Sequence, residues 1–190
     1  MKNILIQYAK RFTDLSDAEL ERIVEEIPMA AFKKGTILLR QGEIPDKCYF
    51  VLQGCVRQYA SDENGKESTF QFFTEEQGVT IFNQHAGDKA SKYSLGCVED
   101  CVLVVGDLSK QQAMYDMHFG LEKMILKMIE ENLGEARDEF AAFIAATPEE
   151  RYKSLLKNRP DLINRVPQYQ LASYLGITPE SLSRIKRRFE

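Results

Sequence analysis

The period of hydrophobic positions changes twice along this chain. Near the N-terminus apolar side chains recur at helical spacing, and Ser16 with Glu19 forms the capping box of a helix that should end near Glu26. From Phe32 to about Val105, short runs rich in β-forming residues are closed by glycine turns, which is typical of an antiparallel sandwich or roll. After these runs the helical period returns. The pattern therefore predicts an α+β chain with a β-roll between helical segments.

A long apolar stripe predicts a helix from about Met117 to Ala146. Its members, at spacings of three and four residues or directly adjacent, are Leu121, Ile125, Met128, Ile129, Leu133, Ala136, Phe140 and Phe143. Such a helix is far longer than the average of about eleven residues, and half of it would remain exposed if it packed on one roll alone. The helix either lies on its own β-roll or pairs with a helix of a second chain.

The C-terminal residues 167–190 predict two short helices around a glycine. Gly176 stands where a left-handed residue ends the first helix, and Thr178 with Pro179 provides the cap and first turn of the second. Three apolar residues of the second helix are expected to face inward: Leu182, Ile185 and Phe189. This arrangement predicts a helix-turn-helix.

Charge is distributed unevenly between the two ends of the chain. Residues 151–190 carry nine Lys or Arg against three Asp or Glu, whereas residues 1–150 carry sixteen against twenty-six. The overall charge of −4 hides this division. An acidic body joined to a basic end is what a sensor attached to a nucleic-acid-binding unit would show.

The cysteines and histidines offer candidate metal or catalytic sites. Cys97 and Cys101 have a C-x3-C spacing that suits a metal site, a cluster or a redox pair, but all four cysteines (Cys48, Cys55, Cys97 and Cys101) fall in strand-like apolar runs that favour buried thiols. His85 and His118 are far apart, and we expect His85 in an exposed loop. A metal enzyme of the cupin type needs clustered histidines. We therefore expect no metal site, no catalytic residues and no enzymatic activity.

Two parts of the chain resemble one known family. The segment from Gln170 to Arg188 closely resembles the DNA-binding motif of the Crp/Fnr family of bacterial transcription regulators, and residues 39–57, with Gly42 and Gly54 at the turns, are similar to the β-roll of cyclic-nucleotide-binding domains. The resemblance covers almost the whole chain. It implies an N-terminal antiparallel β-roll of the double-stranded β-helix (jelly roll) kind, a long helix that joins two copies as a homodimer, and a C-terminal all-α helix-turn-helix domain.

The resemblance also implies residue roles. Glu180 and Arg184 match the family's base-reading residues, and arginine pairs with guanine while a carboxylate accepts from the cytosine amine. Their spacing fits a helical salt bridge as well. We expect Ser181 to touch a base edge too, whereas Pro179 replaces another base-reading residue of many members, so the operator is not inferred. Four further residues are expected to contact or flank phosphates: Gln168, Thr178, Arg187 and Arg188.

The expected ligand segment departs from the cyclic-nucleotide pattern. Residues 78–92 lack the family's Gly-Glu-Leu helix start and its Arg-Ser pair, and no arginine occurs between Arg57 and Arg137. Lys89 or Lys92 supplies charge but not the bidentate fork of a guanidinium. We therefore expect no cyclic AMP binding and identify no cofactor. The site either takes another small effector or is filled by its own side chains.

Three parts follow along the chain. Residues 1–116 are expected to form a β-roll sensor domain with an N-terminal helix, residues 117–146 the long dimerisation helix, and residues 147–190 the DNA-binding domain. The boundary of the last part is marked by the Thr147-Pro-Glu-Glu150 cap.

The expected partners are double-stranded DNA, a second copy of the chain and RNA polymerase. A cytoplasmic chain without membrane contact is expected, because neither a signal peptide nor a run of about eighteen apolar residues is present. The alternative is a small-molecule-binding roll with weak or vestigial DNA binding.

Overall fold

The structure, a computed structural model, describes residues 2–79 and 90–189. Its β-roll consists of two antiparallel sheets with strand orders β1-β8-β3-β6 and β2-β7-β4-β5. The strands are β1 (Met29–Phe32), β2 (Ile37–Leu39), β3 (Lys47–Gln53), β4 (Val56–Ser61), β5 (Glu67–Phe73), β6 (Gly78–Val79), β7 (Ser94–Cys97) and β8 (Cys101–Asp107). The predicted antiparallel roll is confirmed.

The inner faces of the two sheets share one apolar core. Val56 on β4 pairs with Cys97 on β7 and with Phe73 on β5, and these side chains pack with Val51 and Leu103 from the other sheet. The turn between β3 and β4 depends on Gly54, because its φ of +103° is a conformation that residues with a side chain rarely adopt.

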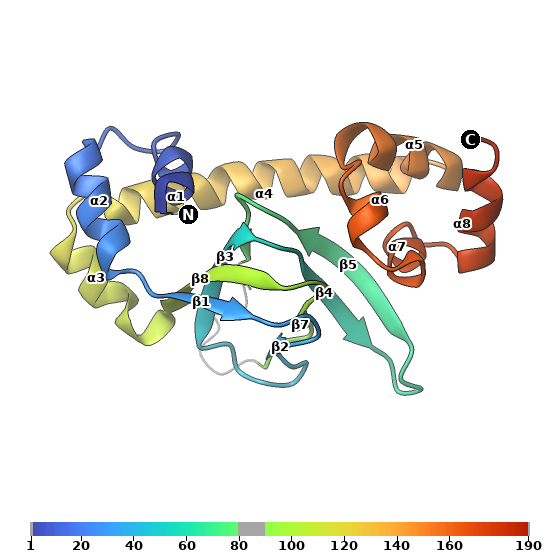
Figure 1. Cartoon of the computed structure of the whole chain (residues 1–190), viewed down its shortest axis with the longest axis horizontal. Helices are drawn as coiled ribbons and strands as arrows, with labels where there is room; N and C mark the ends of the chain where they lie inside the picture. Colours follow the sequence, from blue (N-terminus) through green and yellow to red (C-terminus); the bar gives the residue numbers. More distant parts are fainter. Residues whose placement is uncertain (1, 80–89, 190) are drawn as a thin grey trace.

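Helices surround one end of the roll. The predicted capping box of Ser16 and Glu19 opens α2 (Asp17–Glu26), and α1 (Lys2–Ala9) precedes it. Both helices pack with Phe50 of the roll and with Leu121 and Met124 of the long helix. They therefore cover the first turns of α4 (Leu121–Ala145), as Figure 1 shows.

The predicted start of the long helix was wrong by four residues. A 3₁₀ turn, η2 (Leu108–Lys110), leads into α3 (Gln111–Met117), and α4 begins only at Leu121. Gly120 has a φ of +91° and turns the chain between them. The apolar stripe that predicted the helix has its first member at Leu121, so the predicted start at about Met117 lay upstream of the stripe itself.

The C-terminal unit is all-helical and lies beside the end of α4. It comprises α5 (Pro148–Asn158), α6 (Leu162–Arg165), α7 (Gln168–Tyr174) and α8 (Pro179–Lys186). The predicted Thr147–Glu150 capping box is present. Leu182 and Ile185 are buried as predicted. The prediction that Phe189 faces inward was wrong: α8 ends at Lys186, and Phe189 is 40% exposed, with its ring beside that of Tyr152.

The arrangement of these parts fixes where α8 lies. In Figure 1 α4 runs along the long axis, with α1 and α2 at one end and the C-terminal unit at the other. The roll lies along α4, and α7 contacts β5 of the roll. Helix α8 is placed beyond α7, at the end of the molecule away from α1 and α2.

Candidate nucleic-acid interface

Local hydrogen bonds and two buried side chains position helix α8. Gly176, with a φ of +69°, ends α7, and the Ile177 N–H donates to the Ala172 carbonyl at 3.0 Å. The Thr178 hydroxyl then accepts from the Ser181 N–H at 3.2 Å as the N-cap of α8. Because Leu182 and Ile185 anchor the inner side of the helix, its opposite side is directed to solvent.

The exposed side of α8 carries the residues expected to read bases. Glu180 and Arg184 are exposed and Ser181 is half-buried. Arg184 Nη2 donates to Ser181 Oγ at 3.1 Å, and the ion pairs within 4 Å among the described residues do not include Glu180 with Arg184. The helical salt bridge that the spacing allowed is therefore not formed. Both charged groups remain available to base edges in a major groove.

The carboxylate of Glu180 is held in its ionised form. Its pKa is lowered from the ordinary value by hydrogen bonds, first from its own backbone N–H and then from the Thr178 hydroxyl, and Arg184 adds a smaller charge effect. An ionised carboxylate is an acceptor only. Glu180 can therefore pair with a base amine but would repel a phosphate.

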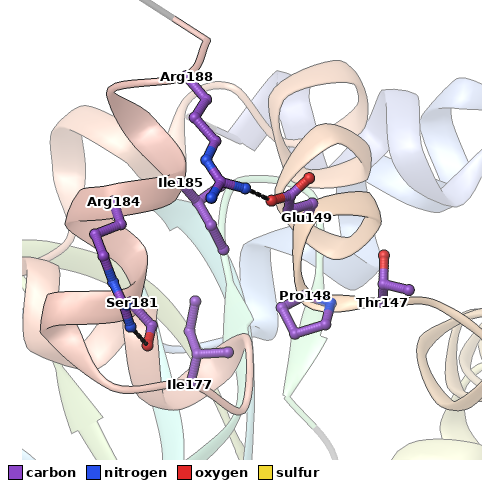
Figure 2. A pocket seen from close by; sticks show the side chains of 8 residues that line it. All are labelled: Thr147, Pro148, Glu149, Ile177, Ser181, Arg184, Ile185 and Arg188. Carbon is purple, nitrogen blue, oxygen red and sulfur yellow. Dashed lines mark hydrogen bonds and ion pairs between the residues drawn. The ribbon is translucent and has the colours of Figure 1, made fainter.

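A groove of about 460 Å³ separates α8 from the start of α5 (Figure 2). Its lining residues are Thr147, Pro148, Glu149, Ile177, Ser181, Arg184, Ile185 and Arg188. Figure 2 shows Arg188 directed across the groove to Glu149, with which it forms an ion pair. Arg188 was expected to contact or flank phosphate, but in this structure its charge is already paired. Sequence patterns gave no sign of this, because 39 residues separate the two partners.

The remaining expected residues lie around the two helices of the motif. Gln168 begins α7, and its Oε1 accepts from Lys186 Nζ at 3.2 Å, so the start of one helix is tied to the end of the next. Arg187 is exposed just after α8. Lys186 and the 59% exposed Tyr169 also lie beside Gln168 but were not among the expected contact residues. In the sequence, Tyr169 directly follows Gln168 and Lys186 directly precedes Arg187.

Residues 29–118 match the sequence model of the cyclic nucleotide-binding domain family. The nitrogen fixation regulation protein FixK of Rhizobium meliloti (strain 1021) is 24% identical over 161 residues, which are 83% of this chain and 72% of FixK. The structure of FixK2 from Bradyrhizobium japonicum has a TM-score of 0.70 at 16% identity, over 85% of this chain and 83% of that one. The structure of CLP from Xanthomonas campestris, a c-di-GMP responsive global regulator, has a TM-score of 0.71 at 15% identity, over 92% and 91%. Residues 29–118 are therefore similar to cyclic nucleotide-binding domains, and the chain as a whole is similar to FixK and shares the fold of these solved regulators.

The roll carries a buried arginine outside its core. Arg57 neighbours Val56, which faces the core, so its side chain is on the other face of β4. Arg57 Nε donates to Thr69 Oγ1 at 2.8 Å, its Nη1 pairs with Glu67, and its guanidinium stacks on the Tyr59 ring at 4.4 Å. This arginine is therefore occupied by partners within its own sheet.

Other candidate ligand residues have ordinary structural surroundings or lie outside the described residues. His85 and Lys89 belong to the second group, and Lys92 is exposed. His118 Nε2 lies 3.0 Å from Glu26 Oε2. Within residues 2–79 and 90–189, no group of three or more His, Cys, Asp or Glu is placed to hold a metal ion. In the same ranges no helix has the length and hydropathy needed to cross a membrane.

The four cysteines are free thiols, three of them buried. Burial raises the pKa of Cys55 to about 12. A hydrogen bond with Cys101, followed by burial, also raises the pKa of Cys97. Because thiolate is the reactive and metal-binding form, Cys55 and Cys97 are chemically quiet near neutral pH.

Proposed function

We propose that this protein is a Crp/Fnr-type regulator, a sequence-specific DNA-binding transcription factor that acts as a homodimer on a two-fold symmetric operator. One observation carries the proposal. Helix α8 is anchored by Leu182 and Ile185 and leaves Glu180 and Arg184 exposed at one end of the molecule, free of an ion pair with each other. A short capped helix with free Arg and Glu side chains is suited to direct readout in the major groove.

The exposed side of α4 supports the dimer. Leu126, Leu133 and Phe140 repeat every seven residues, and each is about half exposed or more. This heptad spacing is the pattern with which two helices pair along a seam. Apolar side chains of this size in one row on a monomer are costly in water and favour a second copy as the partner.

The other side of α4 is already occupied within the chain. Leu121 and Met124 are buried against α1, α2 and the roll, and Ile125 and Met128 pack against the same cluster. The seam available for pairing, formed by Leu126, Leu133 and Phe140, therefore contains fewer residues than the apolar stripe read from the sequence. A parallel pair along this seam would put both copies of α8 at the same end, as two half-sites about 34 Å apart require.

The remaining partners follow from this proposed role. A regulator bound beside a promoter would act on RNA polymerase in the cytoplasm. Its effector would be a small molecule other than cyclic AMP, since the sequence of the ligand segment lacks the family's Arg-Ser pair.

Selection from a random duplex library tests this function. The purified chain would be mixed with the library at about 150 mM salt, where nonspecific phosphate binding is already weakened. We expect an enriched two-fold symmetric motif that Arg184→Ala loses. Binding of a small molecule to the roll without any enriched motif, in its presence or absence, would instead support the alternative of a sensor with vestigial DNA binding.

A further inference from the structure

The C-terminal unit is docked on the roll of its own chain. Strand β5 is an edge strand, so one side of its backbone lacks a partner strand. Ser173 of α7 forms hydrogen bonds with that edge. Its Oγ accepts from the Thr69 N–H at 2.9 Å and donates to the Glu67 carbonyl at 3.4 Å. Helix α7 thus takes the position that another strand would occupy.

Apolar contacts continue from the helix-turn-helix into the roll. The ring of Tyr174 meets that of Phe72 edge-on, with centroids 5.4 Å apart, and Phe72 is fully buried. Cys55 and Val98 of the roll belong to the same buried cluster as Leu171 and Leu162. The roll therefore completes the core of the C-terminal unit instead of merely touching it.

Two arginines hold the polar part of this interface. Arg165, at the end of α6, donates to both carboxylate oxygens of Glu75 at 2.8 Å, and its Nε donates to Glu99 at 3.0 Å. Arg159 Nη2 donates to the Thr74 hydroxyl at 3.0 Å. A bidentate arginine fork fixes orientation as well as distance, because both of its bonds break when the partner rotates.

The docked surface and the reading surface lie on different sides of the unit. Docking uses α7 and the arginines of the α5–α6 segment, whereas Glu180, Arg184 and Arg187 on and after α8 are exposed. Figure 1 shows α8 beyond α7 as seen from the roll. The docked position therefore leaves the reading residues uncovered.

We infer that Arg165, clamped between Glu75 and Glu99, is a positioning residue that fixes the separation and rotation of the two reading helices in the dimer, and so sets the half-site spacing of the operator. This inference rests on the proposed function. The covalent link to α4 is only Ala146 and Thr147, and Arg151 joins the unit to α4 by donating to the Phe143 carbonyl at 3.0 Å. Without the Arg165 clamp, the apolar contacts with the roll would remain, but the rotation of the unit about this link would be less restricted.

DNA geometry makes spacing a sensitive readout of that rotation. One inserted base pair moves a half-site by about 3.4 Å and rotates it by about 34°. A rigidly docked unit cannot follow both changes, whereas a unit whose rotation is less restricted follows them more readily. Loss of a purely structural contact would lower the affinity for operators of every half-site spacing alike. The ratio of the affinities for different spacings therefore separates a positioning role from an effect on stability.

The experiment measures affinities for the selected operator and for versions with one base pair added or removed between half-sites. The variants are Arg165→Gln and Glu75→Gln, which break the clamp from either side, and Lys157→Gln is the control for the lost charge, since Lys157 is exposed on α5. We expect the wild type and the control to prefer one spacing by at least about tenfold, and both clamp variants to fall within about threefold, with unchanged base preference inside each half-site. Amide exchange at Thr69 should speed up by about tenfold in the same two variants.

Each outcome decides a separate question. Failure of the wild type to select any symmetric motif would overturn the proposed function and, with it, this inference. A selected motif whose spacing preference survives in both clamp variants would overturn the inference alone. Equal loss of the preference in Lys157→Gln would also overturn it, because general charge and not the clamp would then set the spacing.

Discussion

Arg165 and Glu75, ninety residues apart in the chain, form a two-bond fork in which each guanidinium nitrogen donates to its own carboxylate oxygen at 2.8 Å. Glu75 also accepts from the backbone N–H of Gly54 at 2.8 Å. One carboxylate thus joins the C-terminal unit, the end of β5 and the turn between β3 and β4. Its protonation state should therefore affect how firmly the unit is held.

Acidification should weaken this junction. Burial alone would raise the pKa of Glu75, but hydrogen bonds from Arg165 and from backbone N–H groups outweigh it, so the pKa is lowered from 4.5. A carboxyl with a lower pKa in the folded state stabilises the fold above about pH 4.5, and this contribution is lost as the pH falls through the lowered value. We expect Glu75→Gln to flatten the fall in unfolding free energy below about pH 4.5, as measured by urea titrations across pH. Glu63→Gln in the exposed β4–β5 hairpin should keep the wild-type slope; an equal flattening there would contradict the assignment.

Arg184 should carry base specificity. Arg184→Ala is expected to cost about 1–3 kcal/mol on the selected operator and to relax the preference at one base pair of each half-site. Binding assays on single-base operator variants would measure it. A loss that is equal for all sequences would show a phosphate contact instead.

Removing Glu149 should strengthen DNA binding. Glu149 neutralises Arg188 beside the reading helix, so Glu149→Gln frees a cation for phosphate. We expect a higher affinity and a salt slope steeper by about one phosphate contact per half-site. Titrations at several salt concentrations would show both effects. Glu21→Gln on α2, at the other end of the molecule, makes the same charge change and should leave the slope unaltered; if it does not, net charge explains the gain.

The seam of α4 should govern association. Leu133→Glu places a charge in the row of exposed apolar side chains and should shift sedimentation toward the monomer mass, because pairing would bury that charge. Met128, which belongs to the same sequence stripe, packs against the α1–α2 cluster instead. Met128→Glu should lower the free energy of unfolding before it affects association. Dissociation by Met128→Glu but not by Leu133→Glu would move the seam to the other side of the helix.

Gly54 should tolerate no side chain. An added Cβ would lie 2.6 Å from Cys101 Sγ and 2.7 Å from the Asp100 carbonyl, in addition to the strain of a positive φ. Gly54→Ala should therefore cost about 2–5 kcal/mol. Gly42 has a similar φ of +90° but open space around the added Cβ, so Gly42→Ala should cost about 1–2 kcal/mol. Equal costs in chemical denaturation would mean that the backbone conformation alone matters.

The local elements were predictable because their causes lie within a few residues. The capping boxes at Ser16 and Thr147 and the cap at Thr178 each join groups three residues apart, and all three are formed. The change from helical to strand spacing of the apolar residues located the roll, because this spacing is also a local property of the sequence. The start of α4 was missed because the left-handed conformation of Gly120, just before the first residue of the apolar stripe, is not visible in the pattern of apolar residues.

The division of α4 into two faces needed the folded chain. Leu121, Met128, Leu133 and Phe140 are equivalent in the sequence pattern, and only the packing of α1 and α2 separates the covered members from the exposed ones. The three-part organisation of residues 1–116, 117–146 and 147–190 stays a prediction. In the structure the last part shares its core with Phe72, Cys55 and Val98 of the first.

The sequence by itself determined the β-roll, the capped helices and the basic C-terminal helix pair, since periodicity, caps and charge act over one or two turns of helix; the base-reading role of α8 stays a prediction. Only the tertiary structure decided that Arg188 is paired with Glu149, that Arg184 is free of Glu180, and that Arg165 clamps the C-terminal unit to the roll. The ion pairs of Arg188 with Glu149 and of Arg165 with Glu75 and Glu99 form between groups that the chain brings together from far apart. Their energy depends on distance and burial, which no local pattern of residues encodes.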